Sequence, residues 1–177
     1  MNLVKNLLEK YSPEIQEELA FKEQMLKFLH EKSDAFHRSC LEGHFTASAL
    51  LLNKDMSKAL LMHHTKLDKW FQLGGHCDGD SNVLAVALKE AQEESGIVKI
   101  EPVYRDIFDI DIHKIPKFNK DPEHLHFDIR FLLKVTSDET VIQNKESKEL
   151  KWFGKDETIP TDNPSVLRLF NKWSCLS

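Results

Sequence analysis

Three glutamates, Glu90, Glu93 and Glu94, are clustered in the run VLAVALKEAQEE. On a helix, positions i, i+3 and i+4 project within an arc of about 100°, so the three carboxylates would share one face. Like charges at this spacing destabilise a helix by about 0.2–0.5 kcal/mol per pair, and Lys89 is the only cation near them in the run. A divalent cation that prefers oxygen ligands, such as Mg2+, would neutralise the face. An ordinary solvated helix face is the alternative interpretation.

Glycines are concentrated around this predicted helix. Four of the six, Gly74, Gly75, Gly79 and Gly96, lie within one short stretch of chain. Glycine allows unusual turns and a close approach of the backbone to a ligand. The stretch therefore predicts a strand, a glycine-dense loop from Gly74 to Asp80, and then the acidic helix.

The segment from Gly75 to Ile97 resembles the Nudix box. That pattern is Gly, five residues, Glu, seven residues, then Arg-Glu-hydrophobic-any-Glu-Glu-any-Gly-hydrophobic. The positions that match are Gly75, Glu90, Ala91, Glu93, Glu94, Gly96 and Ile97. The flanking run HHTKLDKWFQLGGH is similar to that of a bacterial subgroup whose box has a GGHxDGD form.

Two positions depart from the box. Ser81 stands where the family has its first Glu, and Lys89 stands where it has Arg. In the family these residues help to orient the helix carboxylates. Lysine keeps the charge but lacks the planar fork of donors that holds a carboxylate bidentately, and serine supplies no charge. Neighbours such as Asp78 and Asp80 are candidates to replace what is missing.

The resemblance extends over roughly residues 44–173 and implies an α/β fold, a Nudix-type α/β/α sandwich with a mixed sheet. We expect one domain over residues 1–177, made of an N-terminal helical extension (1–40) and a Nudix core (44–173). The activity implied is hydrolysis of a pyrophosphate bond in a nucleoside diphosphate linked to another moiety, with Mg2+ as cofactor and Mn2+ as the alternative ion. The two departures leave open a catalytically impaired module that binds nucleotides or has a regulatory role.

The resemblance also implies roles for individual residues. The metal ligands would be Glu90 and Glu94, with Glu93 third and the backbone carbonyl of Gly74 as a further ligand. Family members often place the general base on a later loop, a few residues before an aromatic side chain, and Glu146 lies six residues ahead of Trp152. Glu149 competes for this role, and a surface carboxylate at a strand edge is the other interpretation. The candidate catalytic residues are Glu93, Glu94 and Glu146.

Histidines form the second group with potential chemistry. His124 and His126 share one face of a predicted strand, and His113 lies on its predicted neighbour. A zinc site, contacts to substrate phosphate, and half-exposed strand positions are the three interpretations. Other polar and aromatic residues flank the glycine loop, where Trp70 would either stack on a base or belong to the core. The candidate substrate-binding residues are His64, Lys66, Trp70, His76 and His126.

The remaining pattern predicts the elements that position these groups. Helices are expected at 2–10 and 13–32, the second with Ser12 as N-cap and Pro13 in its first turn. Their apolar stripe must pack on the core or on a second subunit, which leaves a homodimer open. The further predicted elements are a hairpin of 44–52 and 58–64, half-buried strands at 108–113 and 125–135, a strand near 150–153, and a helix at 164–173.

Composition narrows the class of protein. The 177 residues suit one sizeable core. A net charge of −5, from 24 Lys+Arg and 29 Asp+Glu, disfavours binding to DNA or RNA polymers. The sequence has no apolar run of the roughly 20 residues that span a membrane, and residues 1–30 lack the features of a secretory signal, so we expect a cytoplasmic protein that does not act at a membrane. The partner that the Nudix resemblance implies is a small-molecule diphosphate. Cys40, Cys77 and Cys175 are expected to be free thiols, mostly buried.

Overall fold

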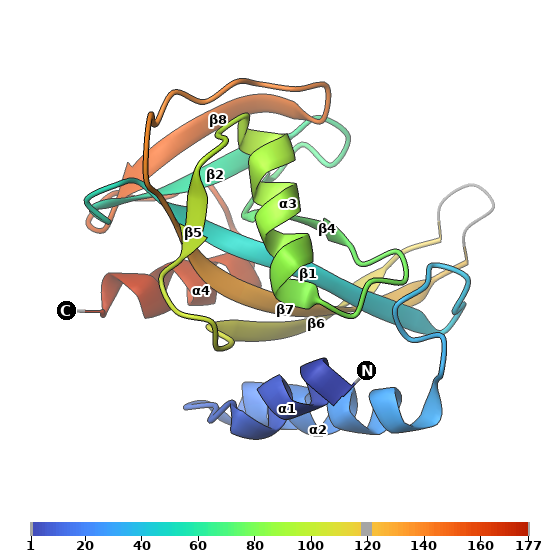
Figure 1. Cartoon of the computed structure of the whole chain (residues 1–177). Helices are drawn as coiled ribbons and strands as arrows, with labels where there is room; N and C mark the ends of the chain where they lie inside the picture. Colours follow the sequence, from blue (N-terminus) through green and yellow to red (C-terminus); the bar gives the residue numbers. More distant parts are fainter. Residues whose placement is uncertain (1, 118–121, 177) are drawn as a thin grey trace.

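The fold was analysed in a computed structural model, which describes residues 2–117 and 122–176 (Figure 1). Its elements are, in chain order, α1 (Asn2–Lys10), α2 (Gln16–Glu31), β1 (Gly43–Leu52), β2 (Lys58–His64), β3 (Trp70–Phe71), β4 (Leu73–His76), α3 (Val83–Ser95), β5 (Ile100–Pro102), β6 (Asp109–Ile115), β7 (His124–Val135), β8 (Ser147–Gly154) and α4 (Pro164–Ser174). The predicted helices at 2–10, 83–94 and 164–173, and the predicted hairpin, are confirmed. The short strand β5 was not predicted from the sequence.

The eight described strands form one mixed sheet around β1. β1 pairs in parallel with β7 along its whole length, from Gly43 opposite Leu125 to Leu52 opposite Lys134. On its other side it pairs antiparallel with β4, and near its end with β2. Strand β8 pairs with β2, and β5 and β6 both pair with β7. The predicted Nudix-type mixed sheet with flanking helices is confirmed.

Helices cover both faces of this sheet. Figure 1 shows α3 in front of β1 and α4 behind it. One hydrophobic cluster joins Phe45 and Ala47 of β1 to α3, and another joins Leu50 and Leu52 of β1 to α4. Since both faces are covered, β1 is buried over all ten residues, and β7 is buried from Phe127 to Leu133. The prediction of a half-buried strand is therefore wrong for β7, whose polar residues Asp128 and Arg130 are buried as well.

The N-terminal helices pack on this same core. Val4 and Leu8 of α1 and Met25 of α2 are fully buried in the cluster that contains Phe45, and in Figure 1 the two helices lie beside β6. The predicted start of the second helix is wrong, because α2 begins at Gln16 and the extended residue Ile15 precedes it without a side-chain cap. Residues 11–15 are used instead for the connection between the two helices.

A strand-loop-helix unit comprising β4, residues 77–82 and α3 positions the glutamates. Asn82 caps α3 by accepting a hydrogen bond from the Ala85 N–H, and Gly96 ends it in the left-handed conformation at φ 73°. The predicted loop began at Gly74, but Gly74 and Gly75 belong to β4 and pair with Ser48 and Ala47. The glycines therefore extend the strand and do not form the loop. Gly74 can pair with Ser48 at this close approach because it has no side chain, whereas a Cβ at this position would lie 2.2 Å from the Cβ of Ser48.

Two further sequence expectations concern cysteines and membrane spans. All three cysteines are free thiols, with Cys40 and Cys77 buried and Cys175 exposed, as predicted. Among the described helices, none has the length and apolar character that crossing a membrane requires.

Candidate active site

Glu94 is the most enclosed of the clustered carboxylates. It lies near the end of α3 and is only 4% exposed. Its Oε2 accepts a hydrogen bond of 2.8 Å from the backbone N–H of Gly74 in β4. The pKa of Glu94 is raised to about 8, chiefly by burial and also by the nearby charges of Glu90, Glu146 and Glu93, while the hydrogen bond from the Gly74 N–H opposes this rise. Without a cation, this carboxyl is therefore mostly protonated at neutral pH.

Glu90 lies one helical turn earlier and approaches β4 equally closely. A Cβ added to Gly75 would lie 2.5 Å from Oε2 of Glu90, so only glycine leaves room for this carboxylate. Burial raises the pKa of Glu90, with Lys89 opposing and Glu93 and Glu146 adding to the increase. The β4–α3 packing thus places two carboxyl groups where burial raises both pKa values, and the charge of Glu90 further disfavours the ionisation of Glu94.

Glu93, the third of the group, faces solvent. Its side chain is 58% exposed, and its carboxylate lies 3.7 Å from Nζ of Lys89, which also lies 3.5 Å from Glu90. Lys89 therefore supplies positive charge to two of the glutamates from the position where the Nudix box has Arg. The Asp residues expected to stand in for the missing first Glu are engaged elsewhere. Asp78 pairs with Arg38 at 2.6 Å, and Asp80 accepts the Asn82 N–H.

Glu146 is held near the helix carboxylates by the loop before β8. The Ile142 N–H donates to the Ser95 carbonyl, and Nδ2 of Asn144 donates to the Glu93 carbonyl, so the loop is fastened to the C-terminal end of α3. Asn144 also accepts the N–H of Glu146. The charge of Glu146 acts on both Glu90 and Glu94. The structure thus brings Glu146 together with the α3 glutamates, whereas Glu149 lies exposed on β8, opposite His63 of β2.

The candidate substrate-binding residues fall into two places. His64 lies next to the Glu146 loop, and its Nδ1 accepts the backbone N–H groups of Lys66 and Leu67. Burial lowers the pKa of His64, and the charge of Glu146 opposes that shift. Trp70 is buried in the α4-side core, with its ring stacked on His63 at 5.1 Å. Base stacking by Trp70 stays a prediction, since this core position accounts for its burial.

His76 and His126 lie together in a different place, with three other histidines. This histidine cluster consists of His44, His76, His113, His124 and His126, with ring centroids between 4.8 and 5.3 Å apart for neighbouring pairs. His44 was not among the candidate residues predicted from the sequence. No linear pattern links it to the others, because the parallel register of β1 and β7 brings residues about eighty positions apart side by side.

The residues around Glu94 fit a divalent cation of the hard, oxygen-preferring kind. Glu90 and Glu94 offer carboxylate oxygens at a place where burial and the repulsion from Glu90 disfavour the ionisation of Glu94. A cation would relieve that repulsion and replace the proton on Glu94. For Gly74 the structure gives a role to the N–H, which orients Glu94, and the carbonyl ligand stays a prediction.

Fold and site together define an α/β protein that presents clustered carboxylates at a strand-loop-helix unit. Residues 42–173 match the NUDIX domain, so the chain belongs to the Nudix family, whose members hydrolyse pyrophosphate bonds and generally use divalent metal ions. No curated protein matches the sequence. The resemblance to a bacterial subgroup stays a prediction, as does the division of the chain at residues 40 and 44.

Solved structures support the fold. A hydrolase of the NUDIX family from Clostridium perfringens is 24% identical, with a TM-score of 0.54 over 73% of this chain and 95% of that chain. An Ap4A hydrolase from C. elegans is 19% identical, with a TM-score of 0.54 over 73% and 94%. A UDP-X diphosphatase is 17% identical, with a TM-score of 0.52, but its match covers 97% of this chain and 77% of that chain. This last likeness therefore extends into the N-terminal helices.

Proposed function

We propose that this Nudix hydrolase cleaves a pyrophosphate bond in a nucleoside diphosphate linked to another moiety, and that it depends on Mg2+, with Mn2+ as the alternative ion. The observation that carries the proposal is the buried carboxyl of Glu94, held by Gly74 and surrounded by Glu90 and Glu146. The neighbours named an Ap4A hydrolase and a UDP-X diphosphatase motivate nucleoside diphosphate derivatives as the substrate class.

The chain's own residues have distinct parts in this proposal. Glu90 and Glu94 hold the cation, Glu93 is the third acidic ligand, and the Gly74 N–H fixes the orientation of Glu94. When bound, the cation offsets negative charge that develops on phosphoryl oxygens and lowers the pKa of water. Glu146 accepts the proton of the attacking water, since its loop places a carboxylate beside those ligands.

Turnover measurements test the proposal directly. The full chain is assayed with Mg2+ or Mn2+ against dinucleoside polyphosphates and nucleoside diphosphate sugars, with release of phosphate or nucleotide as the readout. Glu94→Gln should lose nearly all turnover while its circular dichroism stays that of the wild type. Unchanged turnover in this variant would refute the assignment of α3 as the catalytic helix.

A matched pair of variants identifies the general base. Glu146→Gln should lower kcat with little change in affinity for the cation, because Glu146 acts on water and not as a ligand. Glu149→Gln, exposed on β8, should behave like the wild type. The reverse result would assign the base to Glu149.

A catalytically impaired binding module is the second candidate, because Ser81 and Lys89 replace charged or bidentate groups of the box. In that case calorimetry would show a nucleotide bound without being consumed, and the Ser81→Glu, Lys89→Arg double variant would gain turnover. Measurable hydrolysis by the wild type would exclude this candidate. The cytoplasmic location and the homodimer stay predictions.

A further inference from the structure

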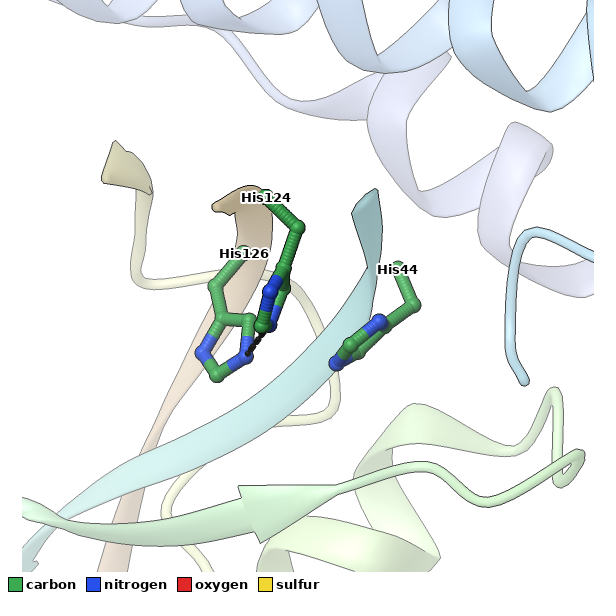
Figure 2. Close-up of side chains that lie close together, drawn as sticks. All are labelled: His44, His124 and His126. Atoms are coloured by element: carbon green, nitrogen blue, oxygen red, sulfur yellow. Dashed lines mark hydrogen bonds between the residues drawn. The ribbon is translucent and has the colours of Figure 1, made fainter. Parts of the chain in front are cut away.

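The sheet register brings histidines of neighbouring strands to the same level. His44 of β1 lies directly opposite His126 of β7, and His126 lies opposite His113 of β6. His124 is two residues from His126 and so projects from the same face of β7. Three of these side chains, His44, His124 and His126, have one ring nitrogen each within 4.8 Å of the other two (Figure 2).

His44 is buried without a normal hydrogen bond. It is 3% exposed, and neither ring nitrogen has a hydrogen-bond partner of normal geometry within the described ranges. Figure 2 shows its ring directed toward His124 and His126. A buried polar group that lacks a partner destabilises the fold, so a metal ion that accepts a lone pair of His44 would remove that cost.

His124 is arranged in the way that metal-binding histidines commonly are. Its Nδ1–H donates to the Pro122 carbonyl at 2.8 Å, which leaves the lone pair on Nε2. This Nε2 lies 3.3 Å from Nε2 of His126. Two nitrogens bound to one tetrahedral Zn2+ at about 2.0–2.1 Å would be separated by about 3.3–3.4 Å. The backbone carbonyl that fixes the ring of His124 also matches the outer-sphere partner of ligating histidines.

We propose that His44, His124 and His126 form a second metal site, which takes a transition-metal ion that prefers imidazole, such as Zn2+. The three nitrogens lie within 4.8 Å of one another, so rotation of the His44 side chain suffices to bring it to the separation of a filled site. Imidazole nitrogens suit Zn2+ and its first-row neighbours, whereas Mg2+ selects oxygen ligands. The fourth position is left for water or for His76, whose ring lies 5.1 Å from that of His44.

This site lies apart from the glutamates. Phe45 and Ala47 of β1 face the cluster that contains α3, so the alternating residues His44 and Thr46 face the opposite side of the strand. Glu90 approaches Gly75, which pairs with Ala47. A metal at the histidines and a cation at Glu90 and Glu94 would therefore occupy opposite faces of β1.

Calorimetric titration of Zn2+ into the full chain tests the site. The protein carries no affinity tag, has been freed of metal with EDTA, and is measured in excess Mg2+ so that the glutamates are occupied. We expect one equivalent of Zn2+ to bind, and His44→Gln and His124→Gln each to weaken binding by about tenfold or more. The matched control His30→Gln removes an exposed histidine of α2 and should bind like the wild type.

A spectroscopic readout keeps the proposal testable if a cluster variant fails to fold. Co2+ bound to the wild type should give the intense visible bands of tetrahedral nitrogen coordination, which excess Mg2+ leaves unchanged. The proposal is overturned if Zn2+ does not bind in excess Mg2+, if Mg2+ abolishes the Co2+ bands, or if folded His44→Gln and His124→Gln bind with wild-type affinity.

Discussion

Glu94 makes the stability of the metal-free protein depend on pH. Its pKa of about 8 in the folded protein compares with an ordinary value of 4.5. A carboxyl with a raised pKa binds its proton more tightly in the folded than in the unfolded chain, so it costs stability wherever the unfolded chain has lost that proton. The cost is absent below pH 4.5, grows between pH 4.5 and 8, and stays constant above pH 8.

The size of this cost follows from the shift. Each unit corresponds to about 1.4 kcal/mol, so the free energy of unfolding should fall by up to about 5 kcal/mol over the interval because of Glu94 alone. Glu94→Gln removes the ionisation but keeps the shape, and the amide oxygen still accepts the Gly74 N–H. The variant should therefore match the wild type near pH 4.5 and exceed it in stability at pH 8 and above.

Urea denaturation in EDTA at pH 5, 7 and 9 measures this difference. Groups that titrate equally in both proteins cancel when the two free energies of unfolding are subtracted. Glu93→Gln is the matched control, since that side chain is 58% exposed and should change stability little. Saturating Mg2+ should narrow the gap at pH 9, because a cation bound to the folded state stabilises only the chain that keeps the carboxylate.

The reasoning fails if the difference between Glu94→Gln and the wild type is the same at pH 5 and pH 9. Such a result would mean that Glu94 is hydrated and that no repulsion exists for a cation to relieve. If the stability difference grows with pH but does not change when Mg2+ is added, Glu94 is buried as described but does not bind the cation.

Three further substitutions examine the packing around the site. Gly75→Ala places a methyl group 2.5 Å from Oε2 of Glu90 and should lower kcat by about 100-fold in a folded protein. Near-normal turnover in this variant would show that the position of Glu90 does not matter for catalysis. Arg130→Met removes the buried guanidinium that pairs with Asp109, Asp111 and Asp128, and although Arg168 still pairs with Asp109 and Asp111, the loss should cost about 3–5 kcal/mol in urea unfolding, unlike a neutral surface change. Leu8→Ala should cost about 2–5 kcal/mol in the single global transition, while Leu3→Ala, 49% exposed, should cost little; equal effects would mean that α1 is not part of the core.

The local sequence was sufficient to predict those helices and strands in which the hydrophobic periodicity and the residues at the ends indicate the same boundaries. The apolar stripe of α3, with Asn82 before it and Gly96 after it, fixes the helix and therefore the shared face of Glu90, Glu93 and Glu94. The start of α2 was predicted wrongly, because Ser12 and Pro13 satisfy the local rules for a helix start but belong to the connection between the helices.

Residue spacing along the chain was enough to identify the family and the clustered carboxylates, since both depend on one helix and the strand before it. Which carboxylate is buried follows from contacts between distant segments, because the burial of Glu94 depends on the β4 backbone and on the loop of Glu146. Contacts of the same kind bring His44 to His124 and His126, because strand register is set by pairing between distant segments and leaves no periodic signal in the chain.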